Sequence, residues 1–226
     1  MKKFELTSEF ITNIFGTKLF RIKALVTFGS VDAGDLGGYI EKESNLSHDG
    51  DAWVYGNAWV YGDAWVSGDA WVSDNARVSG DARVSGDAWV SGDAWVSGDA
   101  WVSDNARVSG DAWVSGDAWV SDNARVSGDA RVSGDAWVSG DAWVSGDARV
   151  SGDADYAYAH GFGSVNRTTT FFRLNDGGVG VRCGCFYGTL DEFREKVRET
   201  HKESNLAQEY MMLADLMEMR FQRREE

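Results

Sequence analysis

A six-residue unit repeats 17 times in succession over residues 51–152, without insertions, and no other feature of the sequence limits the fold as strongly. The unit is [DN]-A-[WR]-V-[SY]-[GD]. Six residues are too few for a strand followed by a helix, which excludes leucine-rich, ankyrin and similar repeats. The chain must therefore wind about an axis, so that each unit packs against an equivalent unit on the next coil.

Alternation along a strand divides the side chains of each unit between two faces. Alanine and valine lie two positions apart and share one face, while the Trp or Arg between them points to the other. The pair that follows is Gly-Asp, Asp-Asn or Gly-Asn, and such pairs favour turns. Each unit is therefore predicted to be a short strand and a corner, with alanine and valine inside. Proline is absent from the chain, which agrees with uninterrupted strand pairing.

The unit, read from its valine, is V-[SY]-[GD]-[DN]-A-[WR], and it resembles the hexapeptide-repeat family. The resemblance implies a mainly β fold, a triangular, left-handed parallel β-helix or β-solenoid with three units in each coil. Similar short repeats also occur in right-handed triangular β-helices, so the period leaves the hand open. Three units per coil place each position beside its equivalent three units further on, and the 17 units then make nearly six coils.

The two flanks of the repeat are predicted to cap its open strand edges, which every solenoid must cover. Residues 1–50 are expected to form a small β-rich N-terminal cap, with an alternating strand over 18–25. Residues 51–164 are expected to form the β-helix, and residues 153–165 are interpreted as a decayed repeat at its end. Residues 165–226 are predicted to form a C-terminal ββαα cap. The turn of the β-hairpin is predicted at residues 175–178. A capping box at residues 189–192 is predicted to start the first helix, and the second helix is predicted to start at residue 205.

The layout as a whole resembles uncharacterised hexapeptide proteins of bacteria, phages and prophages. The resemblance rests on the repeat, on GDLGGYI at 34–40 and NLS at 45–47, and on GCF at 184–186 and TLDEF at 189–193. The resemblance implies a capped β-helix and a phage-like origin, but it gives almost no information on activity. Proteins of this kind are often labelled transferases on the repeat alone.

The Trp or Arg position is the one feature that packing does not explain. All 11 tryptophans occupy it, and six arginines fill it elsewhere. At a spacing of three units these side chains form outer columns, in which indoles stack and arginines cap them. Exposed apolar surface marks interaction sites, and Trp and Arg are enriched in binding hot spots; the alternative is that the columns only shield the strands. The predicted binding residues are Trp53, Trp59, Trp65, Trp71, Trp89, Trp95, Trp101, Trp113, Trp119, Trp137, Trp143, Arg77, Arg107 and Arg131.

These columns favour a non-catalytic structural protein that assembles with itself or binds another protein. One alternative is a carbohydrate-binding module, in which indoles stack on sugar rings. Another is a hexapeptide-type acyltransferase, which the resemblance implies. Such enzymes usually use a histidine base at a subunit interface and often a protruding loop. The repeat block has neither, because His48, His160 and His201 all lie outside it. His160, in the stretch AHGFG, is expected to lie in a turn.

The formal net charge of -14 makes nucleic acid and anionic membranes unfavourable partners, and it suits a basic protein. No apolar run is long enough to cross a bilayer and no leader pattern is found, so a cytoplasmic protein is expected. Cys183 and Cys185 are expected to lie on one strand face as small buried hydrophobes. Together with His201 they fall short of the four ligands of a structural zinc site. The nonapeptide signature of calcium-binding β-rolls is absent as well. No metal and no cofactor is therefore expected.

Overall fold

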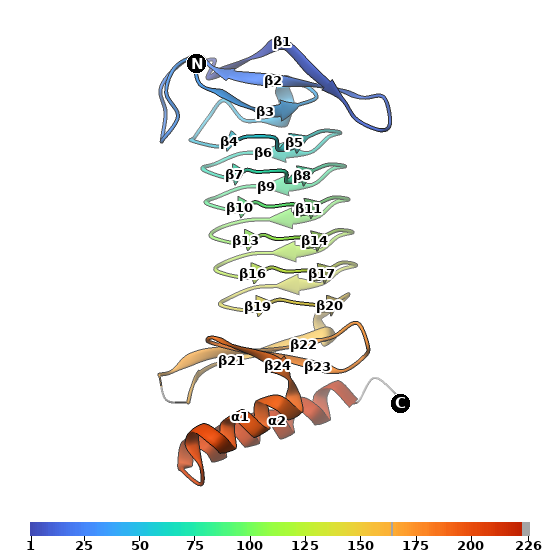
Figure 1. Ribbon diagram of the computed structural model, residues 1–226. Coiled ribbons are helices and arrows are strands. Elements are labelled where there is room, and N and C mark those ends of the chain that lie inside the picture. The colour runs from blue at the N-terminus through green and yellow to red at the C-terminus, as the bar shows by residue number, and fades with distance from the viewer. Residues whose placement is uncertain (164, 223–226) are drawn as a thin grey trace.

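Seventeen two-residue strands, β4 to β20, form a stalk that is closed at each end by a cap (Figure 1). The computed structural model describes residues 1–163 and 165–222, so the predicted boundary at residue 164 and the last four residues of the predicted C-terminal cap lie outside it. Each stalk strand consists of the Trp or Arg of one unit and its valine. The strands are β4 Trp53–Val54, β5 Trp59–Val60, β6 Trp65–Val66, β7 Trp71–Val72, β8 Arg77–Val78, β9 Arg83–Val84, β10 Trp89–Val90, β11 Trp95–Val96, β12 Trp101–Val102, β13 Arg107–Val108, β14 Trp113–Val114, β15 Trp119–Val120, β16 Arg125–Val126, β17 Arg131–Val132, β18 Trp137–Val138, β19 Trp143–Val144 and β20 Arg149–Val150.

Each stalk strand pairs in parallel with the strand that lies three units further on, as Trp101 does with Trp119. Three faces result, named here after their first stalk strand. The β4 face has the order β4-β7-β10-β13-β16-β19, the β5 face β5-β8-β11-β14-β17-β20, and the β6 face β6-β9-β12-β15-β18. The prediction of three units per coil and a parallel β-solenoid of about six turns is confirmed.

The interior of the stalk is a stack of alanine and valine side chains, as predicted. From Ala52 to Val150 these residues are at most 1% exposed. Burying one valine contributes about 1.5–3 kcal/mol, and the stack repeats that gain in every unit. Successive coils are joined by regular backbone bonds; the amide of Trp95 donates to the carbonyl of Ala112 at 2.9 Å. The core therefore consists of the two positions that alternation assigned to the inside.

Most corners of the stalk place glycine in the left-handed backbone region. A Cβ on Gly98, whose φ is +71°, would lie 2.9 Å from the backbone nitrogen of Gly116 in the next coil. Asp74, Asp104 and Asp122 occupy the same conformation, with φ near +60°. Aspartate tolerates this region better than most residues do. The carboxylate of Asp122 also accepts a bond from the amide of Gly140 in the next coil, at 3.0 Å.

The N-terminal cap is the predicted β-rich element, built from β1 Phe4–Thr12, β2 Lys18–Ala24 and β3 Leu36–Ile40. Strand β2 pairs antiparallel with both β1 and β3. Strand β3 also pairs in parallel with β5, and this pairing joins the cap to the stalk. A short 3-10 helix, Glu43–Asn45, follows. Burial lowers the pKa of Lys3 from its usual 10.5. Its side-chain nitrogen donates to the carbonyls of Gly50 and Ala52 at the start of the first coil.

The C-terminal cap is a four-stranded antiparallel sheet with two helices, and it begins earlier than predicted. Its strands are β21 Tyr156–Phe162, β22 Arg167–Arg173, β23 Val179–Cys183 and β24 Phe186–Thr189, and its helices are α1 Leu190–His201 and α2 Asn205–Gln222. The segment expected to be a decayed repeat contains a short 3-10 helix, Asp153–Asp155, and then β21. Tyr156 pairs with Phe172, so this strand belongs to the cap. The hairpin turn and the capping box of Thr189 and Glu192 are confirmed.

A second hydrophobic cluster, separate from the stalk core, joins the cap sheet to its helices. Phe171 and Val181 of the sheet pack with Phe193 of α1 and Tyr210 of α2. Neither α1 nor α2 is long and apolar enough to cross a membrane, and no other α-helix occurs in the described part of the chain.

Candidate binding surface

The outward side chains of the stalk form the three predicted columns, one on each face. On the β4 face the column runs from Trp53 to Trp143, on the β5 face from Trp59 to Arg149, and on the β6 face from Trp65 to Trp137. The strand pairing fixes this order, because each side chain lies beside its equivalent on the next coil. The columns are therefore as regular as the strands that carry them.

Serines of the preceding coil hold the indoles in a common orientation. The Nε1 group of Trp119 donates to the Oγ of Ser103 at 3.2 Å, and Trp101 and Trp137 make the same bond to Ser85 and Ser121. In each case the serine occupies the fifth position of the unit one coil back. The repeat thus supplies both the ring and the acceptor that orients it.

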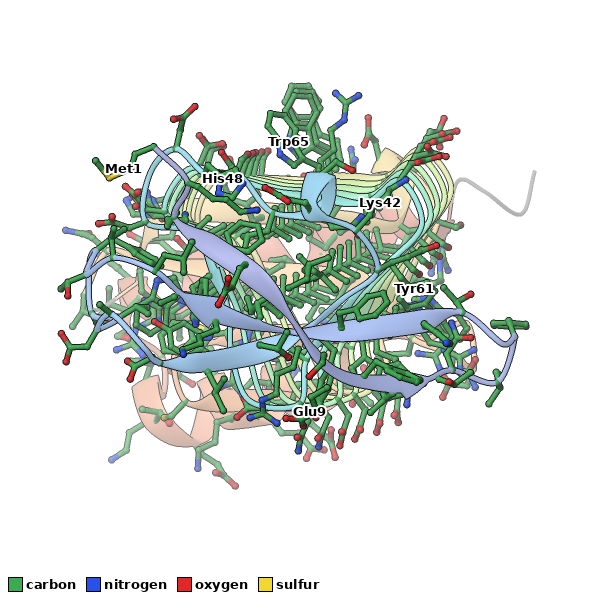
Figure 2. All side chains as sticks on the ribbon, turned by 90° about the horizontal axis from the view of Figure 1, so that it is seen from above. Met1, Glu9, Lys42, His48, Tyr61 and Trp65 are labelled. Atoms are coloured by element: carbon green, nitrogen blue, oxygen red, sulfur yellow. The ribbon has the colours of Figure 1, made fainter. Side chains whose placement is uncertain are left out.

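Neighbouring indoles stack on the β5 and β6 faces, whereas Trp71 and Trp89 of the β4 face meet edge-on, 5.8 Å apart at 60°. The rings of Trp101 and Trp119 are 4.9 Å apart with an angle of 3° between their planes, and those of Trp119 and Trp137 are 5.3 Å apart at 13°. On the β5 face Trp95 and Trp113 stack at 5.1 Å and 2°. Ring faces thus point along the stalk and ring edges point outward. Figure 2, which looks down the stalk, shows the ring of Trp65 broadside at the edge of the molecule.

Arginines cap the stacks, as the columns predicted. Arg77 lies 4.6 Å from the ring centroid of Trp59, Arg107 lies 5.5 Å from that of Trp89, and Arg131 lies 5.6 Å from that of Trp113. These arginines are exposed. Cation–π contacts at exposed sites contribute about 0.5–1 kcal/mol each. The predicted arginine residues therefore lie on the surface with their guanidinium groups on indole rings.

Exposure of the predicted tryptophans differs from face to face. Six are exposed: Trp65, Trp89, Trp101, Trp113, Trp119 and Trp137. Four are half-buried: Trp59, Trp71, Trp95 and Trp143. The prediction that Trp53 is exposed is wrong, because it is 1% accessible. The N-terminal cap covers it with edge-on contacts from Phe4, at 6.2 Å, and Phe28, at 5.4 Å. The β6 face carries the exposed stack of three.

The exposed stack of the β6 face continues onto the C-terminal cap. A hollow of about 520 Å³ lies beside Trp137, which is 50% exposed, and Leu216 and Met219 of α2 line its other side. Met212, one turn earlier on the same helix, is exposed too. We call Trp101, Trp119, Trp137, Met212, Leu216 and Met219 the β6 surface.

The helical part of the β6 surface was missed from the sequence, although a signal for it exists. Leu213, Met217 and Phe221 form the buried stripe of α2, four residues apart. Met212, Leu216 and Met219 form a second apolar series on the same helix, and they stay exposed. A helix with more apolar positions than one buried stripe needs has residues left for another contact.

Two acidic columns border the β6 face. Asp99, Asp117 and Asp135 precede its strands, and Asp104 and Asp122 follow them; all five are exposed. Figure 2 shows side-chain oxygen atoms gathered at the corners on both sides of Trp65. The apolar stack is therefore framed by negative charge along much of its length.

Cys183, Cys185 and His201 line one hollow of about 330 Å³ in the C-terminal cap, whereas His48 and His160 lie elsewhere. His48 lies in the N-terminal cap, where its Nδ1 accepts a bond from the amide of Lys3. His160 lies within β21, so the prediction of a turn is wrong; Ala159 next to it pairs with Thr169 of β22. His201 ends α1. Among the described residues, no group of three His, Cys, Asp or Glu side chains is placed to hold a metal ion.

The prediction that both cysteines are buried on one strand face is also wrong. Cys183 ends β23 and is buried, and its sulfur accepts a bond from the Thr169 hydroxyl at 3.2 Å. Gly184 then turns the chain with φ of +60°, and Cys185 is exposed. The turn breaks the alternation that would have placed the two sulfurs on one face. Both thiols are free.

Comparison with known families agrees with the architecture of the stalk. The family described as the YdcK beta solenoid repeat matches residues 52–68, 70–86, 76–92, 82–98, 100–116, 124–140 and 130–146. No curated protein matches the chain. All matched segments lie within the parallel coils of β4 to β19 and the corners between them. The resemblance to a solenoid-forming repeat is thus confirmed, and this chain is a β-solenoid repeat protein whose stalk is similar to the YdcK beta solenoid repeat in the matched segments and carries exposed tryptophan ladders.

Proposed function

We propose that this chain is a non-catalytic scaffold that binds a protein partner through the β6 surface. The observation that carries the proposal is the stack of Trp101, Trp119 and Trp137, which is exposed and continues beside a hollow onto Leu216 and Met219. Exposed apolar patches of this kind mark interaction sites. Tryptophan and methionine are both favoured at protein interfaces.

The geometry of the stack supports a protein partner over a carbohydrate. A sugar ring packs against the flat face of an indole. Here Trp119 is covered by a neighbouring ring at 4.9 Å on one side and 5.3 Å on the other. Only the ring edges of Trp119 are left for a partner. Apolar side chains can pack against a ridge of ring edges, whereas a flat sugar cannot stack there.

Charge supports a basic partner over a second copy of this chain. Two β6 faces brought together would align the column of Asp99, Asp117 and Asp135 with other carboxylates. Like charges about 5 Å apart repel by roughly 1 kcal/mol per pair even in water. A partner with an apolar centre and a rim of Lys or Arg meets the stack and the acidic borders at once. We therefore expect such a protein to be the ligand.

The proposal is tested with the triple variant Trp101→Ser, Trp119→Ser, Trp137→Ser. The control, Trp71→Ser, Trp95→Ser, Trp113→Ser, removes three tryptophans from the other two faces. Immobilised wild type and control should capture the same protein from a lysate of the organism that encodes the chain, and the β6 variant should lose it. The captured protein, once purified, should bind more weakly as salt increases.

Other outcomes would assign the surface differently. Equal capture by the β6 variant would contradict the proposal. A molar mass that rises with concentration in light scattering, and does so only while the β6 tryptophans are present, would show self-assembly in its place. A change of tryptophan fluorescence on a glycan panel, lost in the same variant, would favour the carbohydrate-binding alternative.

A further inference from the structure

A second hollow lies on a different face, where the last coil of the β4 face meets the C-terminal cap. Its volume is about 290 Å³. Three arginines line it: Arg125 of β16, Arg167 of β22 and Arg182 of β23. They come from segments far apart in the sequence, in a chain whose net charge is -14. A convergence of cations in so acidic a protein needs a physical reason.

No carboxylate of the described residues neutralises these three arginines. None of the three guanidinium groups forms a salt bridge or donates a hydrogen bond to another described residue. The Nε group of Arg182 is buried and has no acceptor within the described ranges. A buried donor left without an acceptor costs about 1–3 kcal/mol. This donor set therefore lacks the acceptor that would offset that cost.

The aromatic system of Trp143 holds two of the guanidinium groups in place. Arg182 lies 3.8 Å from its ring centroid and Arg125 lies 5.5 Å from it. The indole is itself fixed, since its Nε1 donates to the Oγ of Ser127 at 3.1 Å. These cation–π contacts restrain the guanidinium groups without using their N–H donors as hydrogen bonds to the protein. The donors are thus kept available in a defined position.

Glycine makes room for the third guanidinium group. A Cβ on Gly184 would lie 1.7 Å from Nη1 of Arg167, so any other residue there would displace that side chain. The one acid that lines the hollow, Asp141, accepts a bond from Asn123 at 3.1 Å and lies 3.8 Å from the Nδ1 of His160. With three arginines and one carboxylate, the hollow keeps an excess of positive charge.

We infer that this hollow is a binding site for a small multivalent oxyanion, such as the phosphate groups of a small molecule. Guanidinium groups match the oxygen atoms of such anions with paired N–H donors. One carboxylate would leave most of the positive charge unmatched, whereas a di- or triphosphate would balance it. The site lies on the β4 face, so the inference does not depend on the proposed protein-binding role of the β6 surface.

The test is calorimetric titration with pyrophosphate at low salt. Arg125→Gln removes a donor of the site. Arg131→Gln is a matched control on the β5 face. Arg125 and Arg131 both lie in an Ala-Arg-Val-Ser-Gly sequence, and both substitutions remove one positive charge. One equivalent of pyrophosphate should bind to wild type and to Arg131→Gln. Binding should weaken about tenfold or more in Arg125→Gln and Arg182→Gln, as expected for loss of a charge-assisted hydrogen bond.

Two results would overturn the inference. One is the absence of saturable binding to the wild type. The other is equal weakening in Arg125→Gln and Arg131→Gln, which would show a general effect of net charge. Thermal unfolding of each variant shows that it is folded. Acetate at matched ionic strength should bind at least tenfold more weakly than pyrophosphate, and equal affinity would exclude a site for multivalent anions.

Discussion

The side-chain nitrogen of Lys3 lies 2.9 Å from the carbonyl oxygen of Ala52, the first alanine of the repeat. It also lies 3.0 Å from the carbonyl of Gly50. Inside the stalk, alanine carbonyls accept from the coil before them, as Ala112 does from Trp95. The first coil has no such neighbour, so a lysine ammonium takes its place. The N-terminal cap therefore completes the hydrogen bonds of the stalk as well as covering its core.

The far end of the stalk needs the opposite groups. There the amide nitrogens of the outward residues lack a following coil. Trp137 donates to the carboxylate of Asp153 at 3.0 Å, and Trp143 donates to the hydroxyl of Thr170 at 2.9 Å. The two caps are thus chemically different, because the two edges of a parallel coil present different backbone groups.

Replacing Lys3 with methionine should destabilise the protein. Lys3→Met keeps most of the apolar stem but leaves the carbonyls of Gly50 and Ala52 without their donor. The expected loss is about 1–3 kcal/mol in the free energy of unfolding. Urea unfolding followed by circular dichroism measures it. Lys2→Met, at an exposed lysine nearby, is the control, and an equal effect of both substitutions would refute the role of Lys3.

A larger side chain inside the stalk should cost more than the same side chain at a corner. Ala118 is fully buried, whereas Asp117 next to it is exposed. Ala118→Leu should overpack the core and lower the free energy of unfolding by about 1–3 kcal/mol or more. Asp117→Leu should change it by less than that. Thermal unfolding of both variants makes the comparison, and a smaller effect at Ala118 would contradict the packing described here.

The corner at Asp122 should prefer glycine over alanine. Its φ of +58° lies in the left-handed region, where a Cβ without a compensating hydrogen bond is unfavourable by roughly 1–2 kcal/mol. Both substitutions lose the bond to the amide of Gly140. Asp122→Ala should therefore be less stable than Asp122→Gly by about that amount. Chemical unfolding of the two variants measures the difference in their free energies of unfolding. Equal stability would argue against backbone strain at this corner.

Tyr156 should make stability depend on pH in the alkaline range. Burial raises its pKa above the usual 10.0, and its hydroxyl donates to the carbonyl of Trp137. Above pH 10 the unfolded chain ionises this group first, so its contribution is complete below pH 10 and declines as the pH rises. Tyr156→Phe should lose about 0.5–1.5 kcal/mol at neutral pH.

The difference between wild type and Tyr156→Phe should then shrink above pH 10, in urea unfolding repeated across the alkaline range. Tyr158→Phe removes the hydroxyl of an exposed tyrosine two residues away and is the control. A difference that stays constant with pH would show that the ionisation of Tyr156 is not linked to folding.

The two cysteines should differ in reactivity. Cys185 is exposed and Cys183 is buried, and accessible thiols react with disulfide reagents faster than buried ones do. One thiol per chain should react quickly in the native protein and two after unfolding. Cys185→Ser should abolish the fast reaction. Two fast thiols in the native protein would mean that the cap opens readily around β23.

Much of the stalk could be predicted from the sequence because each repeat unit packs against units of nearly the same sequence. Every unit has the same neighbours, three units before it and three units after it, so the period predicts strand, corner, pairing and column together. Ala118 inside and Trp119 outside follow from alternation alone. The columns of the candidate surface follow in the same way. Beyond the period, these features need only the three units per coil that the resemblance to hexapeptide repeats implies.

The ends of the stalk depended on contacts that no period specifies. Trp53 and Trp89 both lie in a Gly-Asp-Ala-Trp-Val sequence, yet Phe4 and Phe28 bury Trp53 whereas Trp89 stays exposed. Cys185 is exposed because Gly184 turns the chain, and this turn is set by the pairing of β23 with β24.

The repeat unit determines that alanine and valine lie inside and tryptophan and arginine outside, and its resemblance to hexapeptide repeats implies the three-sided coil and the outer columns. Three-dimensional contacts were needed to establish which indoles stay exposed, that α2 extends the β6 surface, and that Arg125 and Arg182 meet at Trp143. The physical reason is the range of the interactions. Equivalent repeat units contact each other at one fixed spacing, whereas the caps bring together segments whose separation in the chain follows no rule.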